Sequence, residues 1–331
     1  MPGATALSPP RGEGATPHDA LLWDGSAALL RFRAEPGAPA APRLPILLVP
    51  SVINRWYVMD LRPEASLAGD LVRAGHRVYL LDWGVPQDED RHLTWDELLA
   101  RLRRAVRATL RDAGASRLGL LGYCVGGTLA GIHAALHPDG VAAFVNLAGP
   151  FDFGHAGLLG TLTDARWFDP AAIAAAGNVA PWQMQSGFVA LRPTLQLGKW
   201  VGFVDRIWDP AAREAFWALE GWASDNIPFP AAAYARYVRD LYQENQLIEG
   251  RHHVGGERVD LSRIDAPLLN VTADKDTICP PAAALALSEA VSSSDRDWLS
   301  LAGGHVGAVV GGRAPRTLYP KLASWFRDRL V

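Results

Sequence analysis

The chain has 331 residues, of which 49% are hydrophobic and 20% are charged, and its formal net charge is −3. This composition is typical of a globular protein with a large core, and the slight negative charge gives no support for nucleic-acid binding. Two cysteines exclude a disulfide framework, and no apolar run reaches the ~18 residues of a transmembrane helix.

The N-terminal segment, 1–20, is rich in Pro, Gly and Ala and contains no apolar stretch. It predicts a disordered N-terminus and not a signal peptide, which needs an apolar central region. Because free thiols suit a reducing compartment, we expect a cytoplasmic protein.

Between residues 21 and 150, short apolar runs alternate with amphipathic helical patterns. A capping box at Thr94 and Glu97 begins one helix, and Gly114 ends it. Alternation of this kind is typical of a mostly parallel, doubly wound sheet with helices on both faces. The predicted strands are 28–33 at one edge, 45–50, 76–83, 118–123 and 141–148, and further helices are predicted at 61–74 and 125–137.

Residues 151–261 contain no convincing strand and carry half of the twelve tryptophans. We expect a helical cap here, inserted between the two halves of the sheet domain, 21–150 and 262–331. Most of these tryptophans are expected simply to pack, and as a group they predict an apolar lid that excludes water. The cap helices are predicted near 170–176, 181–191, 210–222 and 230–243. In the second half of the sheet domain, strands are predicted at 267–273 and 298–301 and helices from 281 and over 315–330.

The stretch Gly122-Tyr123-Cys124-Val125-Gly126 lies between a predicted strand and a predicted helix. Its spacing, Gly-x-Cys-x-Gly, is that of the nucleophile elbow of α/β-hydrolases with cysteine in place of serine. The glycines are needed because strand and helix nearly touch at such a turn. The motif alone leaves a second interpretation open, a buried structural thiol in a strand-to-helix turn.

Two further groups decide between these interpretations. Hydrolase-fold triads occur in the chain order nucleophile, acid, histidine, and here Asp274 and Asp276 follow the next-to-last strand while His305 follows the last. Carboxyl ends of parallel strands meet at one edge of a sheet, where sites form. The sequence therefore predicts a triad of Cys124, Asp276 and His305. Asp276 is preferred because it lies later in its loop, and Asp274 is expected to shape the turn.

The chemistry of each group suggests its role. Cys124 would be the nucleophile, His305 the general base and Asp276 the group that orients the imidazole. The backbone N–H groups of Val125 and Ile53 would form the oxyanion hole. Because a thiolate that attacks a thioester gives another thioester, the acyl group stays activated. We therefore expect a thioester substrate and an alcohol as the acceptor.

Several stretches together resemble the polyhydroxyalkanoate synthases, including their short, class III/IV-like catalytic subunits. The resemblance implies (R)-3-hydroxyacyl-CoA as substrate, a growing polyester chain as product, release of CoA, and the same triad. Neither a cofactor nor a metal is implied, since the CoA thioester is a substrate. The matching stretches are 49–61, 82–84, 122–127, 276–280, 304–307 and, in the cap, Phe188–Pro193.

The resemblance also implies partners. The short classes work with a second, non-homologous subunit, so such a subunit and a homodimer are expected, with a location at the surface of polyester granules. Asn54 and Tyr123 lie inside matching stretches and are candidate substrate-binding residues. Two positions depart from the family: Thr277 stands where a histidine is usual, and Cys279 beside the acid is given no role.

Other functions stay open at this point. The same triad would serve a thioesterase or ester hydrolase, with water as the acceptor, and a non-catalytic granule protein could keep the fold. A metal site at His252, His253 and Glu257 is not expected, because adjacent histidines point to different places and no third ligand is obvious.

Overall fold

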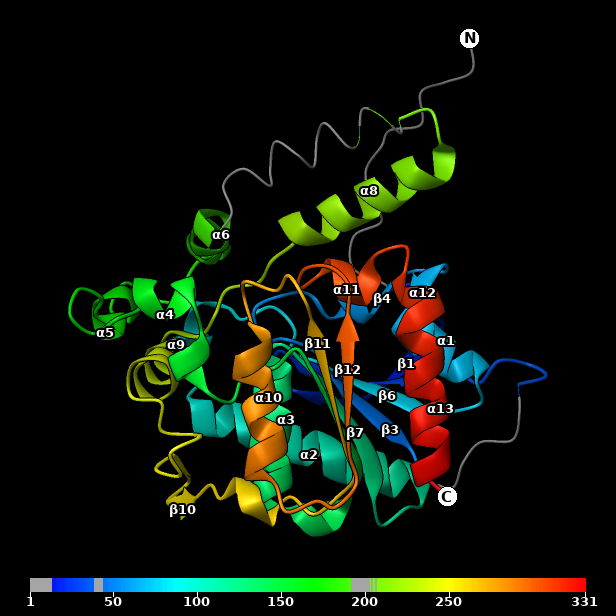
Figure 1. Cartoon of the computed structure of the whole chain (residues 1–331), viewed down its shortest axis with the longest axis horizontal. Coiled ribbons are helices and arrows are strands. Elements are labelled where there is room, and N and C mark those ends of the chain that lie inside the picture. Colours follow the sequence, from blue (N-terminus) through cyan, green and yellow to red (C-terminus); the bar gives the residue numbers. More distant parts are fainter. Residues whose placement is uncertain (1–13, 39–43, 192–202, 204, 206) are drawn as a thin grey trace.

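The computed structural model describes residues 14–38, 44–191, 203, 205 and 207–331. Most of the predicted disordered segment 1–20, and the last two residues of the stretch Phe188–Pro193, lie outside the described residues. Eight strands form one sheet in the order β1-β2-β6-β3-β7-β8-β11-β12 (Figure 1). Their bounds are His18–Asp24, Ala27–Phe32, Val78–Asp82, Ile46–Val49, Leu118–Tyr123, Val141–Leu147, Leu268–Ala273 and Arg296–Leu301, in the same order.

The sheet is parallel from β6 to β12, and only β1 and β2 run antiparallel to their neighbours. The central strands β3, β7, β8 and β11 are buried along their whole length, as expected of parallel strands covered on both faces. On one face lie α2 (Trp95–Ala113), α3 (Val125–Leu136) and α10 (Pro281–Ala290) (Figure 1). On the other lie α1 (Leu67–Arg73) and α13 (Tyr319–Arg329).

Both ends of α2 were predicted from local sequence signals. The hydroxyl of Thr94 accepts a hydrogen bond from the backbone N–H of Glu97, and the Glu97 carboxylate accepts one from the N–H of Thr94. Gly114 ends the helix with a φ of 62°, a left-handed conformation that costs glycine little. The prediction for this helix is confirmed.

The predicted sheet edge was wrong. Residues of the expected edge strand form β2, which pairs with both β1 and β6, so β1 is the true edge and includes residues 18–20 of the segment predicted to be disordered. The backbone N–H and hydroxyl of Thr16 both donate to the buried carboxylate of Asp60, and this fastens the chain just before β1. The two-residue loop Gly25-Ser26 between β1 and β2 was an available hairpin signal.

The described part of residues 151–261 is mainly helical. Where one helix was predicted at 230–243, α9 (Ala231–Arg236) continues into a π-helix, Tyr237–Gln243. The prediction also missed a hairpin of two short strands, β9 (His253–Val254) and β10 (Glu257–Arg258). The other cap helices are α4 (Leu158–Leu162), α5 (Pro170–Ala174), α6 (Pro181–Leu191) and α8 (Pro210–Ser224).

Short elements complete the chain. The predicted helix 61–74 begins only at α1, because β4 (Asp60–Arg62) and β5 (Ala65–Ser66) pair first. The predicted final helix is divided into α12 (Ala314–Thr317) and α13. The remaining elements are α11 (Gly307–Val310) and the 3-10 turns Trp56–Met59, Asp88–His92, Pro138–Gly140, Phe153–His155 and Leu261–Arg263.

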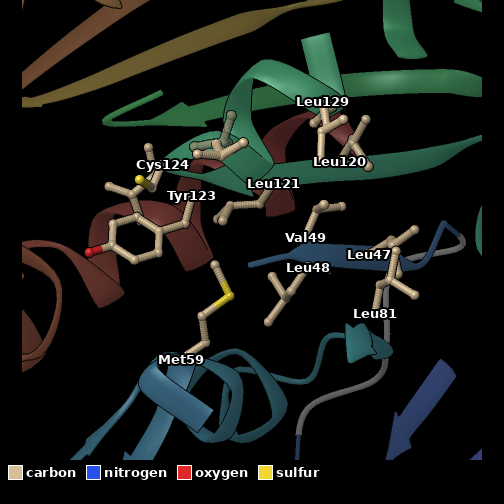
Figure 2. Close-up of a cluster of buried hydrophobic side chains, with 14 of the residues drawn as sticks. Leu47, Leu48, Val49, Met59, Leu81, Leu120, Leu121, Tyr123, Cys124 and Leu129 are labelled. Carbon is tan, nitrogen blue, oxygen red and sulfur yellow. The ribbon is translucent and has the colours of Figure 1, made fainter. Parts of the chain in front are cut away.

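The hydrophobic core extends to the elbow. Leu47, Leu48 and Val49 of β3 and Leu120 and Leu121 of β7 are fully buried. Each such side chain stabilises the fold by about 1.5–3 kcal/mol relative to exposure. Figure 2 shows Tyr123 and Cys124 side by side at one end of this cluster. The nucleophile candidate therefore follows directly on a fully buried central strand.

Candidate active site

Cys124 lies in a strained turn between β7 and α3. Its φ is 56° and its ψ −130°, a conformation that residues other than glycine rarely adopt. A Cβ on Gly122 would lie 2.4 Å from the carbonyl oxygen of Gly126, and one on Gly126 would lie 2.2 Å from that of Val49. Both glycines are therefore required by close backbone packing, as the sequence predicted.

Asp276, and not Asp274, faces His305. Oδ1 of Asp276 accepts hydrogen bonds from the backbone N–H groups of Ile278 and Cys279, each at 2.9 Å. Nδ1–H of His305 donates to Oδ2 at 2.6 Å. Both oxygens of the Asp276 carboxylate thus accept hydrogen bonds, which fix the orientation of this side chain.

Asp274 has a different partner. Its Oδ1 accepts a hydrogen bond of 2.7 Å from the backbone N–H of Gly303. Asp274 therefore joins the loop after β11 to the loop that carries His305. It was expected to shape its own turn, and it instead ties two loops together.

The His305 side chain is buried and stands between two charged neighbours. Its Nε2 is buried and makes no hydrogen bond to a described residue, which leaves this nitrogen for Cys124. Burial alone would lower the pKa of His305, but the charges of Cys124 and Asp276 outweigh it and raise that pKa to about 10. The site therefore stabilises the protonated form of His305.

An apolar cavity of about 180 Å³ opens beside Cys124. Ile53 and Val125 line it together with Cys124, and the opposite wall comes from the cap. Most of its lining is apolar, which suits an acyl chain. The lining residues are Ile53, Cys124, Val125, Pro150, Leu159, Leu162, Thr163, Phe168, Gln183, Met184, Gly187, Phe229, Tyr234, Tyr237, Val238, Tyr242, Ile278 and Cys279.

Two tyrosines of the cap were missed as cavity residues. Tyr237 and Tyr242 belong to the π-helix, their rings meet edge to face with centroids 5.5 Å apart, and burial raises the pKa of both. They are therefore neutral hydroxyls in a mainly apolar wall. A regular helix was expected here, and a π-helix has no sequence signature that would have placed both side chains toward Cys124.

The two predicted oxyanion-hole residues, Val125 and Ile53, both line the cavity that contains Cys124. Val125 is the first residue of α3, so its N–H has no acceptor within the helix. The N–H of Ile53 has only a long contact, 3.4 Å, to the hydroxyl of Ser51. Both donors are available to a developing negative charge.

The two predicted substrate-binding residues are not among the described residues that line the cavity. The side-chain amide of Asn54 donates to Oδ1 of Asn226, and their backbones form an isolated bridge. Asn54 thus ties the loop after β3 to the cap. The Tyr123 ring stacks on the imidazole of His305, with the ring centroids 5.2 Å apart.

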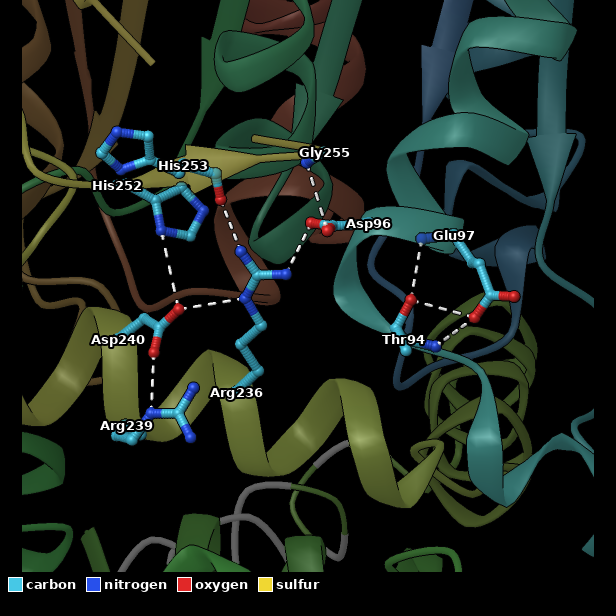
Figure 3. A network of polar contacts seen from close by, with 9 residues as sticks. All are labelled: Thr94, Asp96, Glu97, Arg236, Arg239, Asp240, His252, His253 and Gly255. Carbon is cyan, nitrogen blue, oxygen red and sulfur yellow. Dashed lines mark hydrogen bonds and ion pairs between the residues drawn. The ribbon is translucent and has the colours of Figure 1, made fainter. Parts of the chain in front are cut away.

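The adjacent histidines lie in different surroundings (Figure 3). His252 is fully buried 3.9 Å from Asp240, and burial lowers its pKa to about 4, whereas His253 is exposed. Arg236 bonds to Asp240, to Asp96 of α2 and to the carbonyl of His253. Among the described residues, no group of three or more His, Cys, Asp or Glu side chains could hold a metal ion.

Comparison with known proteins assigns the fold. Residues 45–311 match the family model described as α/β hydrolase fold. A putative lipase from Sulfolobus solfataricus superposes with a TM-score of 0.61 at 15% identity, covering 96% of this chain and 97% of its own. A hydrolase from Pseudomonas aeruginosa gives 0.57 at 20% identity, covering 93% and 98%. The predicted α/β-hydrolase fold is confirmed.

Curated relatives assign the family more closely. A protein from Allochromatium vinosum, named poly(3-hydroxyalkanoate) polymerase subunit PhaC, is 33% identical over 318 residues, which cover 96% of this chain and 90% of that protein. The chain belongs to the poly(3-hydroxyalkanoate) polymerase family. A PhaC subunit from Synechocystis is also 33% identical, over 96% of this chain and 85% of its own. The resemblance to polyhydroxyalkanoate synthases is confirmed.

Thr277 and Cys279, the two positions that depart from the family, follow Asp276 in its loop, and the N–H of Cys279 donates to that carboxylate. In the part of the chain that the structure describes, no helix is long and apolar enough to cross a membrane.

Proposed function

We propose that this protein is an acyltransferase that polymerises (R)-3-hydroxyacyl-CoA into polyhydroxyalkanoate through a covalent thioester on Cys124. Family membership supports the polyester product. The observation that carries the mechanism is the placement of an elbow cysteine beside a buried His305–Asp276 pair, at the end of an apolar cavity. Cysteine keeps the acyl group activated, which a serine ester would not.

In the first half-reaction, His305 holds the proton that it shares with Cys124 while the sulfur attacks the thioester carbonyl of the substrate. The N–H groups of Val125 and Ile53 stabilise the oxyanion. The carbon–sulfur bond to CoA then breaks, and His305 returns the proton to the departing CoA thiolate. The products are acyl-Cys124 and free CoA.

In the second half-reaction, the 3-hydroxyl of another hydroxyacyl group approaches the Cys124 thioester. His305 accepts the hydroxyl proton while the oxygen attacks the carbonyl, and Cys124 leaves as a thiol after receiving that proton. An ester bond replaces a thioester bond, which is downhill. The step needs no cofactor, because the CoA thioester supplies the activation.

The lining of the cavity favours an alcohol acceptor over water. Its wall is mainly apolar, so little water would compete with the hydroxyl of a bound chain. A thioesterase acting with the same three residues would release free 3-hydroxy acid instead.

The experiment is product analysis with 3-hydroxybutyryl-CoA. The proposal predicts CoA release together with ester-linked oligomer, both abolished in Cys124→Ala and both retained in Cys279→Ala, which removes the other thiol of the cavity wall. CoA release with only free 3-hydroxybutyrate would refute polymerisation and establish a thioesterase.

We further propose that the chain acts as a homodimer with a second, non-homologous subunit at the surface of polyester granules. The relatives are named as polymerase subunits, which supports a multi-subunit enzyme. Light scattering of the purified protein and its specific activity with and without the second subunit test this. A monomer with full activity alone would contradict it.

A further inference from the structure

Tyr123 makes a contact that neither half-reaction uses. It is the last residue of β7, directly before Cys124, and is 1% exposed. Its ring and the imidazole of His305 are stacked, with centroids 5.2 Å apart and an angle of 26° between the planes. Tyr123 is not among the described residues that line the cavity, so its ring meets the histidine and not the acyl chain.

The hydrogen bond to Asp276 does not fix the imidazole by itself. It directs Nδ1, but small rotations about the Cα–Cβ and Cβ–Cγ bonds can still tilt the ring and move Nε2 away from the elbow. The Tyr123 ring, stacked on one imidazole face with 26° between the planes, restricts this tilt. The two contacts together therefore define both the direction and the plane of the His305 ring.

The backbone around His305 gives limited help. Gly303, Gly304 and Gly307 flank it, and Gly303 has a φ of 126°, so the local chain has more conformational freedom than most. Asp274 pins the loop at the Gly303 N–H, two residues before the histidine. The side chain depends on its own contacts for its orientation.

We infer that Tyr123 is a positioning residue for His305, whose ring face holds the imidazole in the plane that directs Nε2 to the sulfur of Cys124. The inference rests on the proposed function. It concerns the aromatic face and not the hydroxyl, so phenylalanine should serve equally well.

The stack also has an electrostatic consequence. A cation over the face of an aromatic ring is stabilised by the ring's negative face, and the centroid separation of 5.2 Å lies within that range. The ring should therefore add to the charges of Cys124 and Asp276 in raising the pKa of His305. An aliphatic side chain would fill the space without this effect.

The test compares Tyr123→Phe and Tyr123→Leu in the full chain, through the rate of Cys124 acylation by 3-hydroxybutyryl-CoA from pH 5 to 11. Tyr123→Leu should lower kcat about 10- to 100-fold, leave KM unchanged, and move the alkaline limb of the profile to lower pH. Tyr123→Phe should retain the rate and the profile of the natural chain. Thermal unfolding checks both variants, and Tyr123→Met replaces the leucine variant if that one does not fold.

Two results would overturn the inference. One is an aliphatic variant with a natural rate and an unmoved alkaline limb. The other is a phenylalanine variant that loses as much as the leucine variant, which would assign the effect to the hydroxyl. If the proposed function were wrong, the result would differ from both of these, because Cys124 of the natural chain would not become acylated.

Discussion

Nδ1 of His305 and Oδ2 of Asp276 lie 2.6 Å apart, and both side chains are almost completely buried. The contact joins the loops after β11 and β12, 29 residues apart in the chain. A short hydrogen bond to a carboxylate is among the stronger polar contacts in proteins. It fixes Nδ1 of His305 as the donor to Asp276 and leaves Nε2 for Cys124.

Asp276→Asn tests this contact. The amide can donate its own hydrogen to Nδ1 and so favour the wrong imidazole tautomer, and we expect kcat to fall by about 10³- to 10⁴-fold. Asp274→Asn is the matched control in the same loop, because Asp274 accepts a hydrogen bond from the backbone N–H of Gly303 and an amide oxygen can accept it equally. It should lose less than about tenfold, well below the loss expected when the tautomer is disturbed. Equal losses in CoA-release assays would contradict the assignment of Asp276.

The pKa of His305 should depend on Cys124. Among the charges that raise it to about 10, that of Cys124 is the largest, so Cys124→Ala should move the pKa downward, toward the ordinary value near 6.5. NMR titration of labelled histidine measures this shift. A pKa that is unchanged in Cys124→Ala would show that the two groups do not interact.

The same pKa gives a pH dependence of stability. The folded-state pKa of His305 lies above its unfolded value, so its protonation stabilises the fold fully below about pH 6.5, and this contribution is lost as pH rises toward 10. In Cys124→Ala the loss should begin at the same pH but be smaller and end at a lower pH, because only the folded-state pKa is lowered. Chemical denaturation from pH 6 to 10 compares the two chains, and parallel curves would contradict the expectation.

The elbow glycines should be intolerant of any side chain. In Gly126→Ala the new Cβ would lie 2.2 Å from the carbonyl oxygen of Val49 and 2.4 Å from that of Pro50. Backbone must shift, and we expect a loss of about 1–3 kcal/mol in the free energy of unfolding. A Cβ added at Gly140 would meet nothing within 4 Å. The free energy of unfolding of Gly140→Ala should therefore stay within about 0.5 kcal/mol of that of the natural chain. Similar losses in both would refute the steric argument.

Arg236 should anchor the π-helix to the core. It bonds to Asp240 at 3.0 Å and to Asp96 of α2 at 2.6 Å, and its side chain is 24% exposed. Arg236→Met should lower the free energy of unfolding by about 1.5–3 kcal/mol. Arg239→Met removes the same charge from a 56% exposed side chain that also contacts Asp240, and should cost less than about 1 kcal/mol. If both variants lost the same free energy of unfolding, the hydrogen bond between Arg236 and Asp96 of α2 would contribute nothing to stability.

Features set by neighbouring residues could be predicted from the sequence. The helix α2 follows from its capping box and Gly114, and the positions of Asp276 and His305 follow from the rule that parallel strands end at one edge. Asp276 and Asp274 differed only by their place in one loop, and the preference for Asp276 agrees with its contact to His305.

Features that depend on contacts between residues far apart in the chain could not be predicted from the sequence. Asn54 was expected at the substrate, but it meets Asn226, 172 residues away. Tyr123 lies in the motif itself, yet its stacking on His305 depends on how two loops fold back. The π-helix that turns Tyr237 and Tyr242 to the cavity wall adds one residue to a helical turn, which periodicity does not reveal.

Intact-protein mass spectrometry tests the central claim most directly. After brief exposure to 3-hydroxybutyryl-CoA, the account predicts a mass increase by one hydroxybutyryl unit, then by further units, all located on the peptide that contains Cys124. The increase should be absent in Cys124→Ala and present in Cys279→Ala. No acylation of Cys124 during active CoA release, or acylation of Cys279 instead, would contradict the account.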